Sequence, residues 1–200
     1  YRYAKKVNYN GTKNLVDSII RYKKKIKSIF FASTSHVYKI HHKHVKISEN
    51  QKLQPYSKYG KTKLLAENYF HKHLKQNKIK HCIGRIFSYT ELKQDKTFLV
   101  PSLFNKIKKS NKKVLNFKRL NHYRDFLSIK DISNAIKILC LKNKTGVYNI
   151  GSGKKFNLQK IAIIFCKKFN KRAVFIKSSN NSTHLISNNQ KLCRIGWKPK

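Results

Sequence analysis

The sequence predicts an α/β fold with a largely parallel sheet, and three observations support this prediction. Short apolar segments alternate along the chain with longer segments in which apolar residues recur every three or four positions. Hydrophobic residues make up 40% of the 200 residues, which is enough to bury a core. No apolar run is long enough to span a membrane and no signal peptide is visible, so we expect no membrane partner. Strands that alternate with helices are typical of parallel sheets.

The first half of the chain contains two predicted helices and two predicted strands. Apolar residues on one side of 10–22 predict a helix, and the apolar run 26–32 predicts a strand that ends in small hydroxyl residues. Segment 36–54 is polar and predicts a loop. A second amphipathic helix is predicted at 61–76 and a second strand at 80–87.

The second half repeats this alternation. Further helices are predicted at 98–110, 132–141 and 158–169, and further extended segments at 125–129, 146–150 and 173–177. Asp131 and Asn157 are expected to cap the second and third of these helices, because short polar side chains accept hydrogen bonds from the free N–H groups of a helix start.

The net charge of +40 comes from 47 basic residues against 7 acidic ones. Such a field binds nucleic acids or anionic membranes without specificity. The lysines are spread over almost every predicted helix and loop, and no basic tail, zinc module or aromatic-basic repeat stands out. We therefore attribute the charge to a compositional bias and expect no specific nucleic-acid partner. A basic nucleic-acid-associated protein stays open as an alternative.

The cysteines and histidines do not indicate a metal site. The four cysteines are widely spaced and form no CxxC pair, which predicts reduced thiols and a cytoplasmic location. Four histidines lie in the basic loop without a cysteine or carboxylate ligand before Glu49, so a solvated loop is expected: His36, His41, His42 and His44.

Tyr59 and Lys63 form the most informative pair in the chain. The spacing alone is common here, since Tyr1 and Lys5 show it too. However, Tyr59 opens a predicted amphipathic helix, follows a turn signal, and lies 25 residues after Thr34, which ends a predicted strand. Residues at i and i+4 share one helix face, and an ammonium beside a phenol lowers the pKa of the phenol. The pair therefore suits proton transfer at a carbinol beside a hydride carrier, whereas the alternative is an ordinary surface pair.

Several motifs occur in a fixed order along the chain. They are Asn8-Tyr9-Asn10-Gly11-Thr12-Lys13-Asn14, 31–38 (FASTSHVY), 55–67 (PYSKYGKTKLLAE), Arg124-Asp125-Phe126, 147–153 (VYNIGSG) and Gly196-Trp197-Lys198-Pro199. In this order the chain resembles the extended short-chain dehydrogenase/reductase family, which comprises NAD-dependent sugar-nucleotide epimerases, dehydratases and reductases. The resemblance runs from about residue 8 to residue 199.

The resemblance implies a partial Rossmann-type parallel sheet, its C-terminal half, with a small α/β substrate-binding region. Residues 1–90 would be the C-terminal half of the NAD(P)-binding domain with the catalytic helix. Residues 91–200 would mainly bind substrate, with about 120–150 returning to the first domain. The family's glycine-rich phosphate loop is not matched, so we expect a fragment that lacks roughly three βα units of about 30 residues each and is inactive alone.

The resemblance also implies roles for the catalytic residues. Tyr59 would be the general acid/base, and Thr34 would hydrogen-bond the reacting oxygen. Lys63 would hold the nicotinamide ribose and lower the pKa of Tyr59. NAD or NADP would be the cofactor.

Three further residues are expected near the ligands. Arg124 would bind the pyrophosphate of a nucleotide sugar, with an ion pair to Asp125 as the alternative. Ser88 replaces a substrate-binding asparagine of the family. Asn8 would order the active site near the cofactor, with a simple helix cap as the alternative.

The expected reaction is NAD(P)-dependent epimerisation or keto-reduction of a nucleotide sugar, by a protein that is a homodimer at full length. Family dehydratases follow the catalytic threonine with Asp-Glu, whereas Ser35-His36 stands here. Serine cannot supply the acid for eliminating water, so a dehydratase is disfavoured. A catalytically inactive remnant stays open as an alternative. Gly151-Ser152-Gly153 is not read as a dinucleotide loop, because the glycine pattern fails at Phe156.

Overall fold

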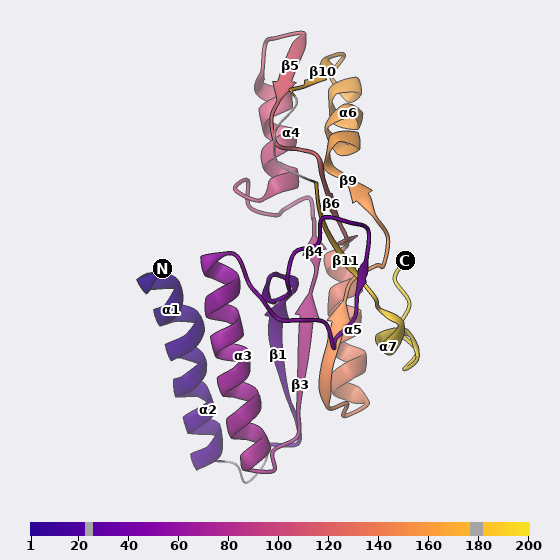
Figure 1. The fold of residues 1–200 in the computed structure, drawn as a ribbon. Coiled ribbons are helices and arrows are strands. Elements are labelled where there is room, and N and C mark those ends of the chain that lie inside the picture. The colour runs from indigo at the N-terminus through magenta and orange to yellow at the C-terminus, as the bar shows by residue number, and fades with distance from the viewer. Residues whose placement is uncertain (23–25, 177–181) are drawn as a thin grey trace.

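The computed structural model describes residues 1–22, 26–176 and 182–200. It contains a three-stranded sheet flanked by helices at one end and a smaller α/β unit around α4 and α6 at the other (Figure 1). Every sheet contains parallel pairs, which confirms the predicted α/β fold. In the described part of the chain no helix is long and apolar enough to cross a membrane. All four cysteines are free thiols, as predicted.

The central sheet has the order β1-β3-β8 and is parallel throughout. Its strands are β1 (Ile29–Thr34), β3 (His81–Ile86) and β8 (Gly146–Ile150). Successive side chains of a strand point to opposite faces. One face therefore packs Ile83 against α2 (Gly11–Arg21) and α3 (Lys58–Gln76).

The other face of the sheet packs against α5 (Ile129–Leu141) and α7 (Gln190–Cys193). Cys82 and Ile150 point to this side, where Trp197 is fully buried. The segment from α5 to β8 thus returns to the sheet that contains β1 and β3. A second unit is formed by one segment between β3 and α5 and by another that follows β8.

The inserted unit has its own core between α4 (Leu99–Lys109) and α6 (Leu158–Lys168). These helices pack on a parallel pair formed by β5 (Val114–Phe117) and β10 (Arg172–Phe175). The buried residues shared by this core are Leu103, Ile107, Leu115, Phe117, Ala162 and Cys166.

Short strands connect the two units. A four-stranded sheet has the order β2 (Lys46–Ile47), β11 (Thr183–Ser187), β6 (His122–Arg124) and β9 (Phe156–Asn157). A separate parallel pair is formed by β4 (Ser88–Tyr89) and β7 (Phe126–Leu127). Residues that follow β3 are thereby held beside the Arg124 segment.

Three of the predicted helix starts are wrong. Helix α3 begins at Lys58 and not at residue 61. Helical structure begins at α1 (Arg2–Lys5) and continues through a π-helical turn, η1 (Lys6–Asn10), before α2. Helix α5 is capped by Ser128 and not by Asp131: the Ser128 Oγ accepts from the Asp131 N–H at 3.1 Å and donates to its Oδ2 at 2.8 Å. Asp131 therefore belongs to the first turn, where its charge suits the helix dipole.

The predicted cap of α6 is confirmed. The Asn157 Oδ1 accepts hydrogen bonds from the N–H groups of Gln159 (2.8 Å) and Lys160 (3.1 Å). The strand predicted at 173–177 corresponds to β10, and its last residue, Lys177, lies outside the described residues. A further strand, β11, which was not predicted from the sequence, follows β10.

The segment predicted as a polar loop has a buried side. It contains the short 3₁₀ helix η3 (Ser35–Val37) and strand β2. Val37, Tyr38 and Ile47 are fully buried, where they pack with Phe87 and Leu185. Strand pairing to β11 orders this segment, which composition alone does not show.

Candidate active site

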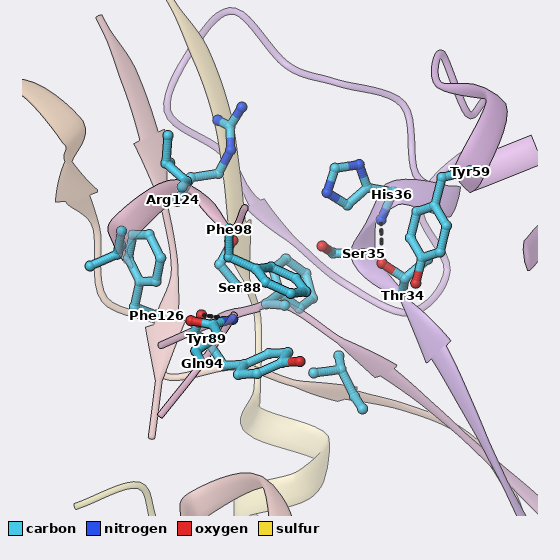
Figure 2. A pocket seen from close by; sticks show the side chains of 14 residues that line it. Thr34, Ser35, His36, Tyr59, Ser88, Tyr89, Gln94, Phe98, Arg124 and Phe126 are labelled. Atoms are coloured by element: carbon cyan, nitrogen blue, oxygen red, sulfur yellow. Dashed lines mark hydrogen bonds between the residues drawn. The ribbon is translucent and has the colours of Figure 1, made fainter. Parts of the chain in front are cut away.

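A pocket of about 570 Å³ opens where β1 and β3 end and α3 begins. Because the carboxyl ends of parallel strands meet at one sheet edge, residues that follow β1 and β3 face the same space. The N-terminus of α3 is fixed there by Ser57, whose Oγ accepts from the Gly60 N–H at 3.0 Å. The pocket is lined by Thr34, Ser35, His36, Tyr59, Ile86, Phe87, Ser88, Tyr89, Gln94, Phe98, Leu99, Val100, Arg124 and Phe126 (Figure 2).

Thr34 and Tyr59 come together on one wall of this pocket, as expected from the sequence (Figure 2). Thr34 is buried at the end of β1, and its Oγ1 accepts from the His36 N–H at 3.3 Å. Burial raises the pKa of Tyr59, a hydrogen bond from the Thr34 side chain lowers it, and Tyr89 raises it. The net shift is upward, so Tyr59 keeps its proton at neutral pH.

Lys63 does not act on Tyr59 as predicted. Its ammonium lies over the Phe31 ring, 4.6 Å from the centroid, and the residue does not line the pocket. Burial lowers the pKa of Lys63, and Glu67 opposes this shift. The expectation that Lys63 lowers the pKa of Tyr59 is therefore wrong in this structure, because the desolvation of the phenol dominates and the ammonium is directed at Phe31.

Asn8 is linked to the active-site helix through a side chain of that helix. Its Nδ2 donates to the Oγ1 of Thr62 at 3.0 Å, and this Oγ1 donates to the carbonyl of Tyr59 at 2.9 Å. Asn8 lies within η1 and caps no helix, so the cap alternative is wrong. Its side chain fixes the turn that carries Tyr59 and does not line the pocket.

Arg124 and Ser88 line the pocket as expected. Figure 2 shows Arg124 across the pocket from Tyr59. One guanidinium nitrogen of Arg124, Nη1, donates to the carbonyls of Tyr123 (2.8 Å) and Thr183 (3.2 Å) and to the Thr183 hydroxyl (3.1 Å). Burial lowers the pKa of Arg124, and Tyr56 opposes this shift.

Asp125 does not pair with Arg124, so the ion-pair alternative is wrong. The Asp125 carboxylate is fully buried and accepts from the N–H and hydroxyl groups of Ser152 and Ser187 and from the N–H of Gly153. A Cβ on Gly151 would lie 2.4 Å from the Ser187 Oγ, so glycine is required there. The Gly151-Ser152-Gly153 turn thus binds a carboxylate of the protein itself.

His36 and Gln94 line the pocket but were not identified as site residues from the sequence. The expectation that His36 belongs to a solvated loop is wrong, because η3 turns its ring into the pocket (Figure 2). Its position two residues after Thr34 was the available signal. Gln94 lies in a polar stretch after β4, and no pattern marks it.

The profile of a family described as GDP-mannose 4,6 dehydratase matches residues 2–198. This chain belongs to that family. The match confirms the resemblance to NAD-dependent sugar-nucleotide epimerases and dehydratases, the extended short-chain dehydrogenase/reductase group.

One sequence relative is a putative UDP-glucose 4-epimerase from Methanocaldococcus jannaschii, 25% identical over 200 residues. The alignment covers 97% of this chain and 64% of the relative, so the chain spans less than two thirds of that protein.

Solved structures share the fold. A dTDP-glucose 4,6-dehydratase from Bacillus anthracis in complex with NAD has a TM-score of 0.85 at 21% identity, covering 98% of this chain and 63% of that one. RMD from Pseudomonas aeruginosa, complexed with NADPH, has a TM-score of 0.85 at 20% identity, covering 98% and 69%. A UDP-glucuronic acid 4-epimerase from Bacillus cereus, in complex with UDP-glucuronic acid and NAD, has a TM-score of 0.81 at 24% identity, covering 96% and 62%.

Proposed function

We propose that the pocket binds a nucleotide-activated sugar, which the intact protein epimerises or reduces with NAD or NADP. The observation that carries this proposal is the meeting of the Thr34 and Tyr59 hydroxyls in a pocket at the carboxyl ends of parallel strands. NAD, NADPH and nucleotide sugars in the solved relatives support the same ligand classes for this chain.

In this proposal each residue of the pocket has a role that follows from its position. A nicotinamide cofactor, when bound, accepts or supplies the hydride. Tyr59, which keeps its proton at neutral pH, donates that proton to a sugar ketone and takes it back from the alcohol in the reverse direction. The Thr34 hydroxyl donates to the ketone or accepts from the alcohol. Arg124 and Ser88 also line the pocket. In this proposal Arg124 binds the pyrophosphate and Ser88 contacts the sugar.

Lys63 fits the ribose of the cofactor. Its ammonium offers three N–H donors. In the described residues the only ion pair joins Arg85 and Glu67, so no carboxylate forms an ion pair with Lys63.

With the cofactor beside Lys63, residues 1–90 and about 120–150 would form the cofactor side of the protein, and the rest mainly the substrate side. Asn8 holds the helix turn that carries Tyr59.

The proposed reaction does not eliminate water from the sugar. None of the seven acidic residues of the chain lines the pocket, and Ser35 cannot supply the acid that protonates a leaving hydroxyl. Epimerisation and keto-reduction need only the Tyr59 proton and a hydride. Formation of a dehydrated keto sugar by the intact protein would contradict this choice.

We also propose that the intact protein is a homodimer. The N-terminal helical segment exposes Tyr3, Val7 and Leu15 by 80%, 55% and 57%. Apolar side chains this exposed on helices suit a second copy of the chain. Light scattering of the intact protein tests this, and a monomer at micromolar concentration would refute it.

The catalytic test compares the 200-residue chain with the intact protein. Both are incubated with UDP- and dTDP-sugars and NAD(P)H, and hydride transfer and epimer formation are followed. We expect turnover by the intact protein only, because a glycine-rich loop that positions the cofactor is not matched in this chain.

Within the intact protein, Tyr59→Phe is expected to lower turnover by about 10²–10⁴-fold, the usual contribution of a general acid/base. Tyr22→Phe, at an exposed site that does not line the pocket, is the matched control and should retain full activity. Turnover by the 200-residue chain, or undiminished activity of Tyr59→Phe, would refute the corresponding part of the proposal.

A further inference from the structure

Arg124 is held on the pocket wall by one of the three nitrogens of its guanidinium. This nitrogen, Nη1, donates to the carbonyls of Tyr123 and Thr183 and to the Thr183 hydroxyl. The other two, Nε and Nη2, make no hydrogen bond with the described residues, and neither is among their buried side-chain atoms that lack a partner. Nε and Nη2 are therefore accessible to a ligand.

Arg85 shows what the same arrangement does when an anion is present. Its Nη1 also donates to protein oxygens, the Tyr38 hydroxyl at 2.9 Å and the Glu49 carbonyl at 3.0 Å. Its Nε and Nη2 both donate to the carboxylate of Glu67. These two nitrogens form the paired donor that matches a carboxylate or a phosphate. In Arg124 the same pair is left without a carboxylate partner within the described part of the chain.

The Thr183 hydroxyl that supports Arg124 is itself oriented by His122. The His122 Nδ1 lies 3.2 Å from the backbone nitrogen of Thr183 and 3.0 Å from its Oγ1. Because a backbone N–H only donates, Nδ1 accepts, and the proton of the neutral ring lies on Nε2. The hydroxyl therefore also donates to Nδ1, and its lone pairs are left to accept from Arg124. Burial and Arg124 lower the pKa of His122, which favours the neutral ring.

We propose that Thr183 and His122 are positioning residues, which hold the Arg124 guanidinium so that its Nε and Nη2 bind the pyrophosphate of the substrate. This inference rests on the proposed function, because it takes the ligand of the pocket to be a nucleotide sugar. Ordering a long side chain costs free energy, so a guanidinium that is already fixed binds a phosphate more tightly than a mobile one. His122 and Thr183 pair across β6 and β11, so this support comes from segments 61 residues apart.

The test measures how much the pyrophosphate adds to nucleoside binding. Dissociation constants of the intact protein, saturated with NAD or NADP, are determined by NMR titration for uridine with UDP, thymidine with dTDP, and guanosine with GDP. The pyrophosphate increment is the ratio of the constant for the nucleoside to that for its diphosphate. Arg124→Ala is expected to lower this increment about 10–100-fold, the effect of hydrogen bonds to a charged group.

Two substitutions remove the proposed support of the guanidinium. Thr183→Val keeps the shape of the side chain and suits a strand, but it removes the hydroxyl. His122→Leu removes the acceptor that orients this hydroxyl. Each is expected to lower the pyrophosphate increment about 3–10-fold, the effect of one lost hydrogen bond, and to leave the affinity for the nucleoside unchanged. Thr145→Val, the same change at an exposed site outside the pocket, is the control and should change neither value.

Three further variants separate positioning from a merely structural role. Thr183→Ser keeps the hydroxyl, and His122→Asn places an amide oxygen close to the position of Nδ1, so both should retain most of the increment. In the Arg124→Ala background, Thr183→Val should lower the increment no further, because the group that it positions is gone. A structural role would instead weaken nucleoside binding as well, and its effect would add to that of Arg124→Ala.

Equal increments in Thr183→Val and Thr183→Ser, or a further loss when Thr183→Val is added to Arg124→Ala, would overturn the inference and leave the proposed function standing. If Thr183→Val does not fold, equal increments in His122→Leu and His122→Asn overturn it in the same way. If Arg124→Ala leaves the increment unchanged, or none of the three diphosphates binds, the proposed pyrophosphate site fails, and this inference fails with it.

Discussion

Two polar clusters lie side by side at the ends of β1 and β3. The polar groups of the first are paired by hydrogen bonds, whereas two polar atoms of the second have no partner among the described residues. In the first cluster the buried Arg85 pairs with Glu67 at 2.5 Å and donates to the Tyr38 hydroxyl at 2.9 Å. Ser33 donates to Glu67, and Tyr38 donates to Asn149 at 2.7 Å. In the second cluster, the pocket, polar atoms of His36 and Gln94 have no partner among the described residues.

The register of the sheet explains why the two clusters are neighbours. Ser33 pairs with Arg85 across the strands, and the next pair is Thr34 with Ile86. Because successive side chains alternate between the faces, one pair enters the satisfied network and the next lines the pocket. The same two strands thus serve stability and function at alternate positions.

The acidic residues sharpen this contrast. The chain has seven acids against 47 basic residues, yet Glu67, Asp125 and Asp131 are buried and hydrogen-bonded. The excess of basic residues therefore does not extend to the buried positions at which the fold needs a carboxylate. The comparison predicts that substitutions in the satisfied network cost stability and that substitutions in the pocket do not.

The largest effect is expected from Glu67→Ala. Removal of one partner leaves Arg85 buried and unpaired, which costs about 3–5 kcal/mol in the free energy of unfolding. Glu91→Ala is the control, because this carboxylate caps only the N–H of Leu92 at an exposed site and should cost about 0.5 kcal/mol or less. Urea denaturation measures both, and a loss below about 1 kcal/mol for Glu67→Ala would refute the central role of the network.

Gly60→Ala tests the junction between the pocket and α3. A Cβ at this position would lie 2.3 Å from the backbone oxygen of His36, so η3 and α3 must separate, at a cost of about 1–3 kcal/mol. Gly11→Ala is the matched control, since no atom lies within 4 Å and alanine should stabilise α2 by about 0.5–1 kcal/mol. If thermal melts show similar changes for the two variants, the close approach at Gly60 is not a constraint.

Acid pH should weaken the fold through its histidines. Burial is the main cause that lowers the pKa of four of them: His36, His71, His122 and His184. Each has a lower pKa in the folded than in the unfolded state, so the unfolded chain binds more protons as the pH falls below about 6.5. The free energy of unfolding should be highest above pH 6.5 and should fall as the pH drops toward the folded pKa values. Denaturation curves from pH 5 to pH 8 check this, and a gain in stability on acidification would refute it.

The smallest effect on stability is expected from Tyr59→Phe, within about 0.5 kcal/mol, because the Tyr59 hydroxyl faces the pocket. Tyr38→Phe removes a buried hydroxyl that donates to Asn149 and accepts from Arg85, and should cost about 1–3 kcal/mol. The same chemical change at Tyr38 and at Tyr59 therefore separates a network residue from a pocket residue. Equal losses in guanidinium denaturation would remove the distinction.

Local patterns allowed much of this structure to be predicted. The helix at 158–169 and its Asn157 cap, the strand at 146–150 and the alternation of helices with strands all follow from periodicity and capping chemistry. The motif order indicated the family, and four of the six predicted site residues line the pocket: Thr34, Tyr59, Ser88 and Arg124. These features depend on residues near one another in the sequence.

The rest was decided by contacts between distant segments. Strand β11 pairs with β2 in the segment 36–54, 140 residues away, and with β6 on its other side. The direction of Lys63, the shell around Asp125 and the unpaired atoms of His36 and Gln94 likewise depend on which groups the fold brings near them. The sequence by itself determined the element types and the family, because both depend on the spacing of residues that are near one another along the chain. Only the tertiary structure decided which polar groups are satisfied, because burial and hydrogen-bond partners come from segments that the spacing does not relate.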